Sequence, residues 1–373
     1  MKQGWEIKKL GEVCKKITNI KWNEIEETTS FPYIDLSAVD RENSSIHDYE
    51  YIDISNAPSR AKQIVKVGDI LFATTRPMVK RACIIPYEFN NAIASTGFCV
   101  LRPQGAVLSE WIYHNIKSNR FYKYIEPIQK GVSYPAVTDN EVKDFCIPIP
   151  PREEQERIVA ELDCLSGVIE RKREQLRELD ALAQSIFYQM FGDPITNEKG
   201  WEVKPLKTIC KKLFAGGDVP KNNFSETRTQ QYPIPIYSNG VGLNALYGFT
   251  DIAKVEDISL TISGRGTIGY CAIRTAPFYP IVRLIVATPI TTIIQPIILK
   301  YIIDWLCLKG TGGAIPQLTI PMIKDKMIIV PPLALQQEFT EKIEAIEKQK
   351  ELISQSITQT EELFNSRMDY YFN

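Results

Sequence analysis

Two stretches of the chain place apolar residues at alternating intervals of four and three positions. The first runs from Ile158 to Met190 and the second from Phe339 to Phe364. This spacing is typical of the a and d positions of a coiled coil, and Glu, Lys and Arg flank it. We therefore expect two long helices, each with an apolar seam that must be covered. The seam positions are Ile158, Leu162, Leu165, Ile169, Leu176, Leu179, Phe339, Ile343, Ile346, Ile353 and Ile357.

Proline and glycine mark the ends of these helices. Pro151 and Pro332 precede the two seams, where the first turn of a helix tolerates proline. Gly192 can cap the first helix, and Pro194 prevents its continuation. Each helix of about forty residues would be a rod of roughly 60 Å. We expect the two to pack on each other as an antiparallel pair within one molecule; pairing between molecules is the alternative.

The rest of the chain has the pattern of short strands. Runs such as GDILFAT from Gly68 and ISLTIS from Ile258 are rich in apolar or β-branched residues and lie near turn residues, which predicts strands. The uncharged run from Leu284 to Leu299 is shorter than the ~20 residues of a membrane span, and two prolines interrupt it. It predicts a buried strand followed by a buried helix.

The two halves of the chain are diverged copies of one plan. Eight of fifteen positions are identical between GWEIKKLGEVCKKIT, from Gly4, and GWEVKPLKTICKKLF, from Gly200. That match has an offset of 196 residues, and two later matches keep the order at offsets of 188 and 181. Such a steady decrease indicates duplication followed by loss of loop residues.

These patterns together predict an α+β fold with a pseudo-two-fold internal repeat. Two mixed, strand-rich globular domains would be separated by two long helices packed as an antiparallel coiled coil, with one domain at each end. The expected boundaries are 1–150 for the first globular domain, 151–195 for the central helix, 196–331 for the second globular domain and 332–373 for the C-terminal helix.

Composition narrows the class of protein. A hydrophobic content of 44% and a charged content of 24% are those of an ordinary soluble globular protein. The formal charge of -1 excludes a uniformly basic surface but allows a local basic patch. The eight cysteines form no CxxC pair, and with two histidines there is no zinc-ligand spacing. We expect buried, reduced thiols in a cytoplasmic protein without a secretory signal or membrane span.

No motif predicts a catalytic centre or a metal site. GRGTIG at Gly264–Gly269 fits the GxGxxG pattern of dinucleotide sites, but a strand and a turn follow it where a helix is required. We expect a tight loop that carries Arg265 instead. There is no GxxxxGK[ST] motif, and neither Pro-Pro pair fits the Asn/Asp-Pro-Pro-aromatic tetrapeptide of amino-methyltransferases.

Basic residues gather on the expected loops. Residues 60–81 hold six basic residues and one acid, with Thr and Gln among them. Such loops suit phosphate contact and base recognition in nucleic acid, although solvated surface charge is the alternative. Residues 24–53 hold nine acids and one base, so we expect that face to point away from nucleic acid.

Four stretches resemble the specificity subunit of Type I restriction–modification enzymes. They are IPIPPREEQERIVAELD at Ile147–Asp163, FGDPITNEKGW at Phe191–Trp201, ISGRGTIG at Ile262–Gly269 and VPPLALQQEF at Val330–Phe339. The resemblance covers the whole chain. The last stretch departs from the family pattern at Leu335, where an acid is usual, but it retains Gln336.

The resemblance implies a non-catalytic subunit that recognises double-stranded DNA. Each globular domain would be a target-recognition domain for one half of a bipartite site. The helices would space the halves, nearly two turns of B-DNA apart at ~34 Å per turn, and dock two modification subunits. S-adenosylmethionine would bind those subunits; ATP and Mg would bind two restriction subunits, where these are present. The alternatives are a single-chain methyltransferase or nuclease-associated enzyme, and a coiled-coil assembly protein without a DNA role.

If the chain is such a DNA-recognition subunit, we expect the DNA contacts on loops of both domains. The residues expected to bind DNA are Arg76, Lys80, Arg81, Arg265 and Thr267, with Lys130, Ser133, Thr311 and Gln317 as further candidates.

Overall fold

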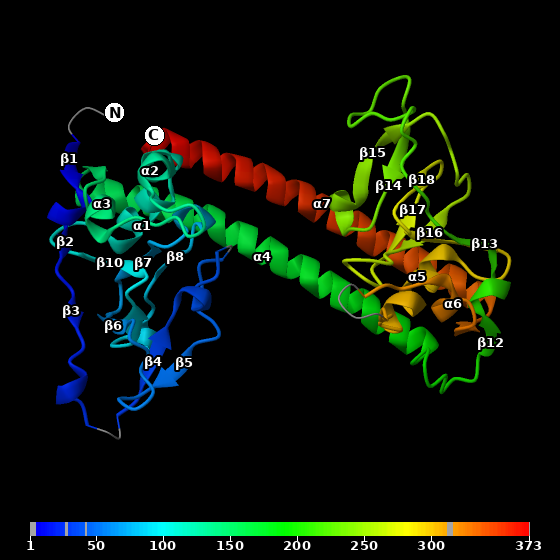
Figure 1. Ribbon diagram of the computed structural model, residues 1–373, viewed down its shortest axis with the longest axis horizontal. Helices are drawn as coiled ribbons and strands as arrows, with labels where there is room; N and C mark the ends of the chain where they lie inside the picture. Colours follow the sequence, from blue (N-terminus) through cyan, green and yellow to red (C-terminus); the bar gives the residue numbers. More distant parts are fainter. Residues whose placement is uncertain (1–4, 27–28, 42, 312–315, 373) are drawn as a thin grey trace. The chain divides into compact units, whose positions relative to one another are not determined.

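The computed structural model describes residues 5–26, 29–41, 43–311 and 316–372. The chain divides into two compact units, one of residues 1–172 with 356–373 and the other of residues 173–355. Each unit contains one strand-rich domain and part of both long helices (Figure 1). The predicted α+β class, the two strand-rich domains and the long helix pair are confirmed. The four domain boundaries stay a prediction, and the division into units falls inside both helices.

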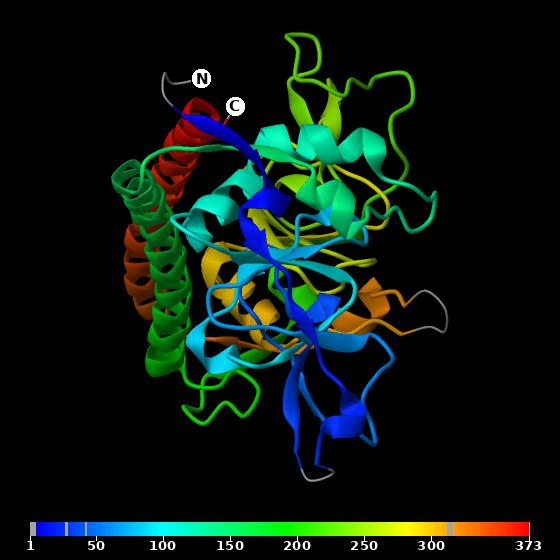
Figure 2. The same cartoon turned by 90° about the vertical axis from the view of Figure 1, so that its left-hand side faces the viewer.

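Unit 1 is built on three sheets in its described part. Strand β1 (Glu6–Lys9) pairs antiparallel with β11 (Cys146–Ile149). The four-stranded sheet has the order β2 (Cys14–Lys15), β10 (Phe98–Pro103), β7 (Ile70–Ala73) and β8 (Ala82–Ile84). The five-stranded sheet has the order β3 (Thr18–Asn19), β6 (Ala61–Ile64), β9 (Ile93–Ser95), β4 (Phe31–Ile34) and β5 (Glu50–Ile52). Because β1, β2 and β3 follow one another along the domain, one segment joins all three sheets (Figures 1 and 2).

Three short α-helices complete the part of unit 1 that the structure describes: α1 (Ser109–Lys117), α2 (Asn119–Ile125) and α3 (Asp139–Lys143). The sequence suggests one helical patch over 109–124, but the structure breaks it at Ser118, which has an extended backbone. The Ser118 hydroxyl accepts a hydrogen bond from the amide of Phe121, so it caps α2. The break turns Phe121 into the core, where its ring meets Phe72 edge-to-face at 5.0 Å.

Unit 2 repeats this topology. Strand β12 (Glu202–Pro205) pairs with β20 (Met327–Val330). The four-stranded sheet has the order β13 (Cys210–Ala215), β19 (Ile285–Pro289), β16 (Ser259–Ile262) and β17 (Cys271–Arg274). The third sheet has the order β15 (Leu246–Thr250), β14 (Ile234–Tyr237) and β18 (Tyr279–Pro280), and the short helices are α5 (Pro296–Trp305) and α6 (Ile320–Ile323). In the described residues of unit 2 no strand corresponds to β3 or β6.

The long apolar run of unit 2 is a strand followed by a helix, as expected. It forms β19, whose five residues are all buried, and the first turn of α5. None of the helices in the described part of the chain combines the length and the apolar character that a membrane crossing requires.

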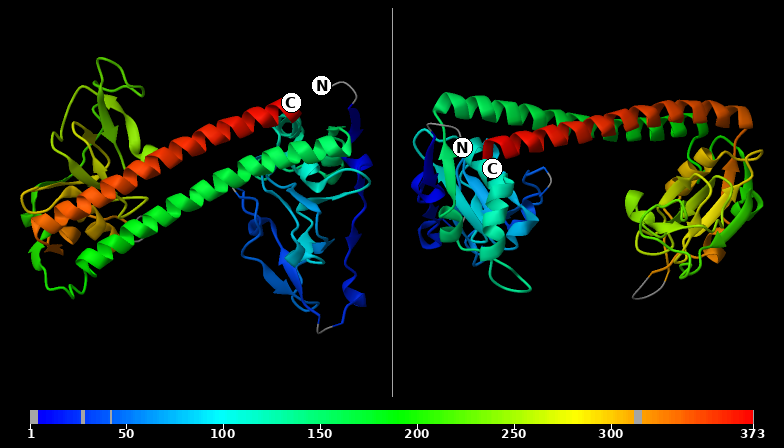
Figure 3. Two further views of the ribbon diagram at one scale, coloured as in Figure 1. Left: turned by 180° about the vertical axis from the view of Figure 1, so that it is seen from behind. Right: turned by 90° about the horizontal axis from the view of Figure 1, so that it is seen from above.

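The two long helices are α4 (Arg152–Phe191) and α7 (Leu333–Phe372), of forty residues each (Figures 1 and 3). In unit 1, Glu161 of α4 contacts Arg367 near the end of α7, with Nε 2.8 Å from Oε1. In unit 2, Asp180 in the second half of α4 contacts Lys350 in the first half of α7, with Oδ1 2.7 Å from Nζ. The pairing is therefore antiparallel and within one molecule, as predicted.

Some seam residues of the two helices belong to the core of unit 1, some belong to the core of unit 2, and the others lie along the helix pair. Ile158 and Leu162 are fully buried in the core of unit 1, and Phe339, Ile343 and Ile346 belong to the core of unit 2. The other buried members are Ile169 and Ile357, and the half-buried members are Leu165, Leu176, Leu179 and Ile353. The heptad pattern thus continues into each domain core, because the start of each helix packs on the domain that precedes it.

One buried glutamine in each unit ties the start of a long helix to the domain. In unit 2, Gln336 Oε1 accepts from the Gln295 amide at 2.8 Å, and its Nε2 donates to the carbonyls of Ile293 and Pro331 at 3.0 and 2.8 Å. Gln155 makes the corresponding set of three bonds in unit 1, to the backbone of Leu108, Ala106 and Pro150. Each amide side chain pairs backbone groups that would otherwise be buried without partners.

We expect Gln336→Leu to lower the free energy of unfolding of the protein by about 3 kcal/mol. Leucine fills a similar volume but leaves one amide and two carbonyls without their partner, and each buried unpaired group costs about 1–3 kcal/mol. The adjacent Gln337 is exposed, and its Nε2 donates to the exposed carboxylate of Glu341 at 3.2 Å. Gln337→Leu is the matched control and should change stability little. Urea unfolding measures both; equal effects of the two variants would contradict the role of Gln336.

The cysteines only partly follow the expectation of buried thiols. Those that are buried are Cys14, Cys83, Cys99, Cys210 and Cys271, while Cys146 is half-buried. The expectation is wrong for Cys164 and Cys307, which are exposed. Cys164 lies on α4 between the seam positions 162 and 165, so it faces away from the seam. Burial raises the pKa of the Cys14, Cys83 and Cys210 thiols to about 12.

Brief treatment of the native protein with iodoacetamide at pH 8 should label Cys164 and Cys307 and spare Cys14, Cys83 and Cys210. Alkylation requires the thiolate, which a pKa of about 12 makes rare at this pH, and burial also excludes the reagent. Peptide mass spectrometry reads out the labelling, and treatment in denaturant is the control in which all eight cysteines react. Rapid native labelling of Cys14 would contradict this core.

Candidate nucleic-acid interface

In each unit, two loops are held together by one equivalent backbone bond. In unit 1 the loop between β7 and β8 meets the loop before α3, where the Val137 amide donates to the Thr74 carbonyl at 3.0 Å. In unit 2 the loop between β16 and β17 meets the loop before α6, where the Leu318 amide donates to the Gly264 carbonyl at 2.8 Å. The GRGTIG segment is therefore a loop between antiparallel strands, as expected, and no helix starts there.

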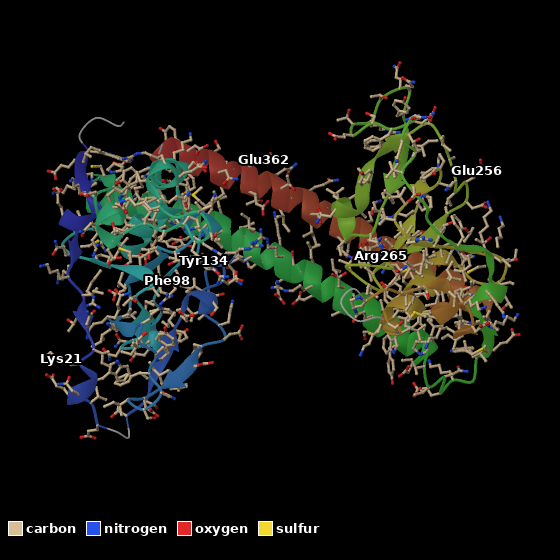
Figure 4. The ribbon with its side chains drawn as sticks, viewed as in Figure 1. Lys21, Phe98, Tyr134, Glu256, Arg265 and Glu362 are labelled. Carbon is tan, nitrogen blue, oxygen red and sulfur yellow. The ribbon has the colours of Figure 1, made fainter. Side chains whose placement is uncertain are left out.

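Two of the predicted cations sit at either end of a tight turn in unit 1. Arg76 and Lys80 flank the 3-10 turn Pro77–Val79, and both have left-handed backbones, with φ of 50° and 64°. The guanidinium of Arg76 lies 4.5 Å from the centre of the Tyr134 ring. Tyr134 belongs to the loop before α3 and is marked in Figure 4. The Lys80 ammonium lies 4.7 Å from the Tyr122 ring. Cation–π contacts of this kind orient exposed cations without neutralising them.

The remaining predictions in unit 1 are less uniform. Ser133 is exposed and directly precedes Tyr134 in the chain. Lys130 is exposed but contacts Glu141 at 3.1 Å. Arg81 Nη1 donates to three carbonyls, those of Leu36, Ser37 and Val39, at 2.8 to 3.2 Å. Arg81 thus ties the start of β8 to the turn after β4, and its contact with DNA stays a prediction.

In unit 2, two of the predicted residues, Arg265 and Gln317, line one hollow. Arg265 Nη2 donates to Gln317 Oε1 at 3.0 Å, and Thr311 pairs with Gln317 through both backbone bonds. Thr267 is exposed on the loop that carries Arg265. Arg265 and Gln317 line a hollow of about 350 Å³, together with Arg283 (Arg265 is marked in Figure 4). The residues 312–315 between Thr311 and Gln317 lie outside the described part of the chain.

Arg283 was not among the residues predicted from the sequence. It is far along the chain from the basic stretch at residues 60–81 and follows the buried strand β18, so no local pattern marks it. Its exposure on a loop and the polar residues across the hollow become visible only when the β-sheet brings residues 264–265, 283 and 317 together. Guanidinium and amide groups arranged around a recess can donate to phosphate oxygens or to base edges.

The acidic stretch and the basic stretch of unit 1 meet at one place. Asp35, Asp48 and Glu50 line a hollow of about 420 Å³ with Arg60. Arg60 therefore faces carboxylates, and the basic residues between positions 60 and 81 do not form a single patch. Arg76 and Lys80 on the loop between β7 and β8 are exposed and remain candidates for binding an anionic ligand.

Comparisons with known proteins agree with this arrangement. A family model described as the Type I restriction modification DNA specificity domain matches residues 2–181 and again residues 198–362. The Type I restriction enzyme MjaIX specificity subunit of Methanocaldococcus jannaschii is 24% identical over 333 residues, which cover 78% of this chain and 76% of that protein.

Two solved structures share the fold along the whole chain. A chain from a structural study of complex assembly and conformational transition in the type I R-M system has a TM-score of 0.60 and 24% identity, with 100% of this chain and 98% of that chain covered. The S subunit of a Type-I restriction-modification system from M. genitalium has a TM-score of 0.60 and 13% identity, with the same shares covered. The chain belongs to the family of Type I restriction modification DNA specificity domains, carries two copies of that domain, and recognises DNA sequence for a Type I restriction–modification system.

Proposed function

We propose that this chain is the specificity subunit of a Type I restriction–modification complex and that each unit recognises one half of a bipartite DNA target. The observation that carries the proposal is the pair of loops that one equivalent backbone bond joins in each unit, Val137 to Thr74 in unit 1 and Leu318 to Gly264 in unit 2. We call these the pinned loops. Both pairs present an exposed arginine, Arg76 or Arg265, beside a second loop. Their surroundings differ, with an aromatic ring in unit 1 and an amide in unit 2. One scaffold would thus present two different readers of DNA.

The long helices supply the second part of the proposal. They would space the two halves of the target and dock two modification subunits. Support comes from apolar side chains on the helix pair of unit 2, where Leu182 and Leu352 are 48% and 59% exposed. With Leu179 and Ile353 they line a hollow of about 520 Å³. Clustered exposed apolar side chains are typical of protein interfaces.

The chemistry of the complex would reside on the partners. S-adenosylmethionine would bind the modification subunits, and ATP with Mg would bind restriction subunits where these are present. The chain itself would be non-catalytic, in the cytoplasm. The described residues contain no group of three His, Cys, Asp or Glu side chains placed to hold a metal ion. A methylation assay separates this proposal from a single-chain enzyme, which would modify DNA without partners, and from an assembly protein, whose complex would select no sequence.

We expect Arg76→Ala and Arg265→Ala each to relax recognition in a different half of the target. The test uses the full chain in complex with its modification subunits, offered a pool of random-sequence DNA duplexes. The wild-type complex should select two constant half-sites separated by an unread gap. Loss of an arginine that contacts a guanine edge costs about 1–3 kcal/mol, or roughly 5- to 150-fold in selectivity at that base pair.

Two controls accompany this test. Lys207→Ala removes one positive charge from unit 2, at an exposed ion pair with Asp325, and should leave the selected motif unchanged. Lys9→Ala removes one positive charge from unit 1, at an exposed ion pair with Asp144, and should also leave the selected motif unchanged. If Arg76→Ala and Arg265→Ala both selected the wild-type motif in full, the assignment of the loops would be wrong.

A further inference from the structure

The loop before β19 holds two consecutive residues in a conformation that side chains seldom adopt. Val282 and Arg283 have φ of 53° and 62°, in the left-handed region. A β-branched residue there is a clear outlier. Strain of this kind persists only where the surrounding structure enforces it, and it clusters at functional sites. The strained backbone therefore indicates that the position of Arg283 has a functional role.

The surroundings enforce this conformation through several hydrogen bonds. The amides of Val282 and Arg283 donate to the carbonyls of Gly217 and Gly216 at 2.8 and 3.1 Å. The Gly216 amide donates in return to Leu284 at 2.8 Å. Gly216 must be glycine, because a Cβ there would lie 2.6 Å from the backbone carbon of Pro280. The end of β13 thus clamps the loop from one side.

Asn239 clamps it from the other side and ties it to Arg265. Its Nδ2 donates to the Val282 carbonyl at 2.7 Å. Its Oδ1 accepts from the amides of Gly264 and Arg265 at 2.8 and 3.4 Å. One side chain therefore fixes the spacing between the two loops that carry Arg265 and Arg283. Both arginines are exposed and line the hollow of about 350 Å³, and within the described residues Arg283 has no ion-pair partner.

Unit 1 has no arginine at the corresponding place. Leu101 pairs with Ile70 in the sheet of unit 1, as Ala287 pairs with Leu260 in unit 2. Leu101 and Ala287 are therefore equivalent positions. Gly97 lies four residues before Leu101, and Arg283 lies four residues before Ala287. A Cβ on Gly97 would lie 2.9 Å from the side chain of Leu36, so a larger residue does not fit there without a shift. The arginine pair belongs to unit 2 alone, as expected if the two units recognise different sequences.

We propose that Arg283 is a specificity-determining residue of unit 2, which together with Arg265 recognises guanine bases in one half of the DNA target. The inference rests on the proposed function. Each guanidinium offers two parallel N–H donors, which match the O6 and N7 acceptors of guanine in the major groove. The fixed spacing set by Asn239 lets two such donors address neighbouring bases, and Asn239 is a positioning residue that acts through both arginines.

The test again uses the full chain with its modification subunits and a pool of random-sequence DNA duplexes. Arg283→Gly removes the side chain and suits the left-handed backbone, so the fold is retained and the thermal midpoint should not fall. Arg283→Lys keeps the charge but replaces the two parallel donors of a rigid plane by one flexible ammonium group. Both variants should lose a guanine preference of 10-fold or more at one position of one half-site. Asn239→Ala should weaken two positions of that same half-site.

The other half-site, and the motif selected by Lys207→Ala, should stay as in the wild type. An unchanged motif with Arg283→Gly would overturn the inference. It would also be overturned if Arg283→Lys behaved like the wild type while Arg283→Gly bound every sequence equally more weakly, with a smaller salt dependence, because that is the signature of a phosphate contact. A wild-type complex that selected no sequence would overturn the proposed function, and this inference with it.

Discussion

Burial of the apolar faces of α4 and α7 is the constraint on which the rest of the structure depends. Leaving the apolar faces of two forty-residue helices exposed to water would be unfavourable. Each unit buries these faces in two ways. Part of each face meets the other helix, and part joins a domain core. The end of α7 illustrates the second way, because Phe372 is 1% exposed and packs against Trp111 at 4.9 Å. Each domain core is thus completed by helix residues from distant parts of the chain.

The repeated contacts show which parts of the plan are fixed and which vary. Gln155 and Gln336 make the same three backbone bonds, and β1–β11 and β12–β20 have the same register. The pinned loops also share their backbone bond. The side chains on those loops differ, and among the described residues the third sheet has five strands in unit 1 and three in unit 2. A frame that both units share, with loops that differ between them, suits one scaffold that must recognise two different DNA sequences.

Much of the frame could be predicted from the sequence, because it is written in local patterns. The heptad pattern predicted both helices, and the internal matches predicted the repeat. The Pro-Pro pairs predicted where each helix begins, and Gly192 predicted where the first one ends. The features that were missed depend on contacts between distant segments. Nothing local shows that Arg81 ties β8 to residues 36–39, that Ser118 breaks a helix, or that Arg283 is strained. The loop residues were identifiable as basic, but their partners, such as Tyr134 and Asn239, follow from the sheet topology.

The central claim is that each unit recognises its own half of the target. It is tested most directly by a chain in which residues 6–149 replace residues 202–330, since the paired strands that frame both segments have matching registers. With modification subunits and a random-sequence DNA pool, this chain should select the half-site of unit 1 twice. Selection of the original two different half-sites would contradict the account.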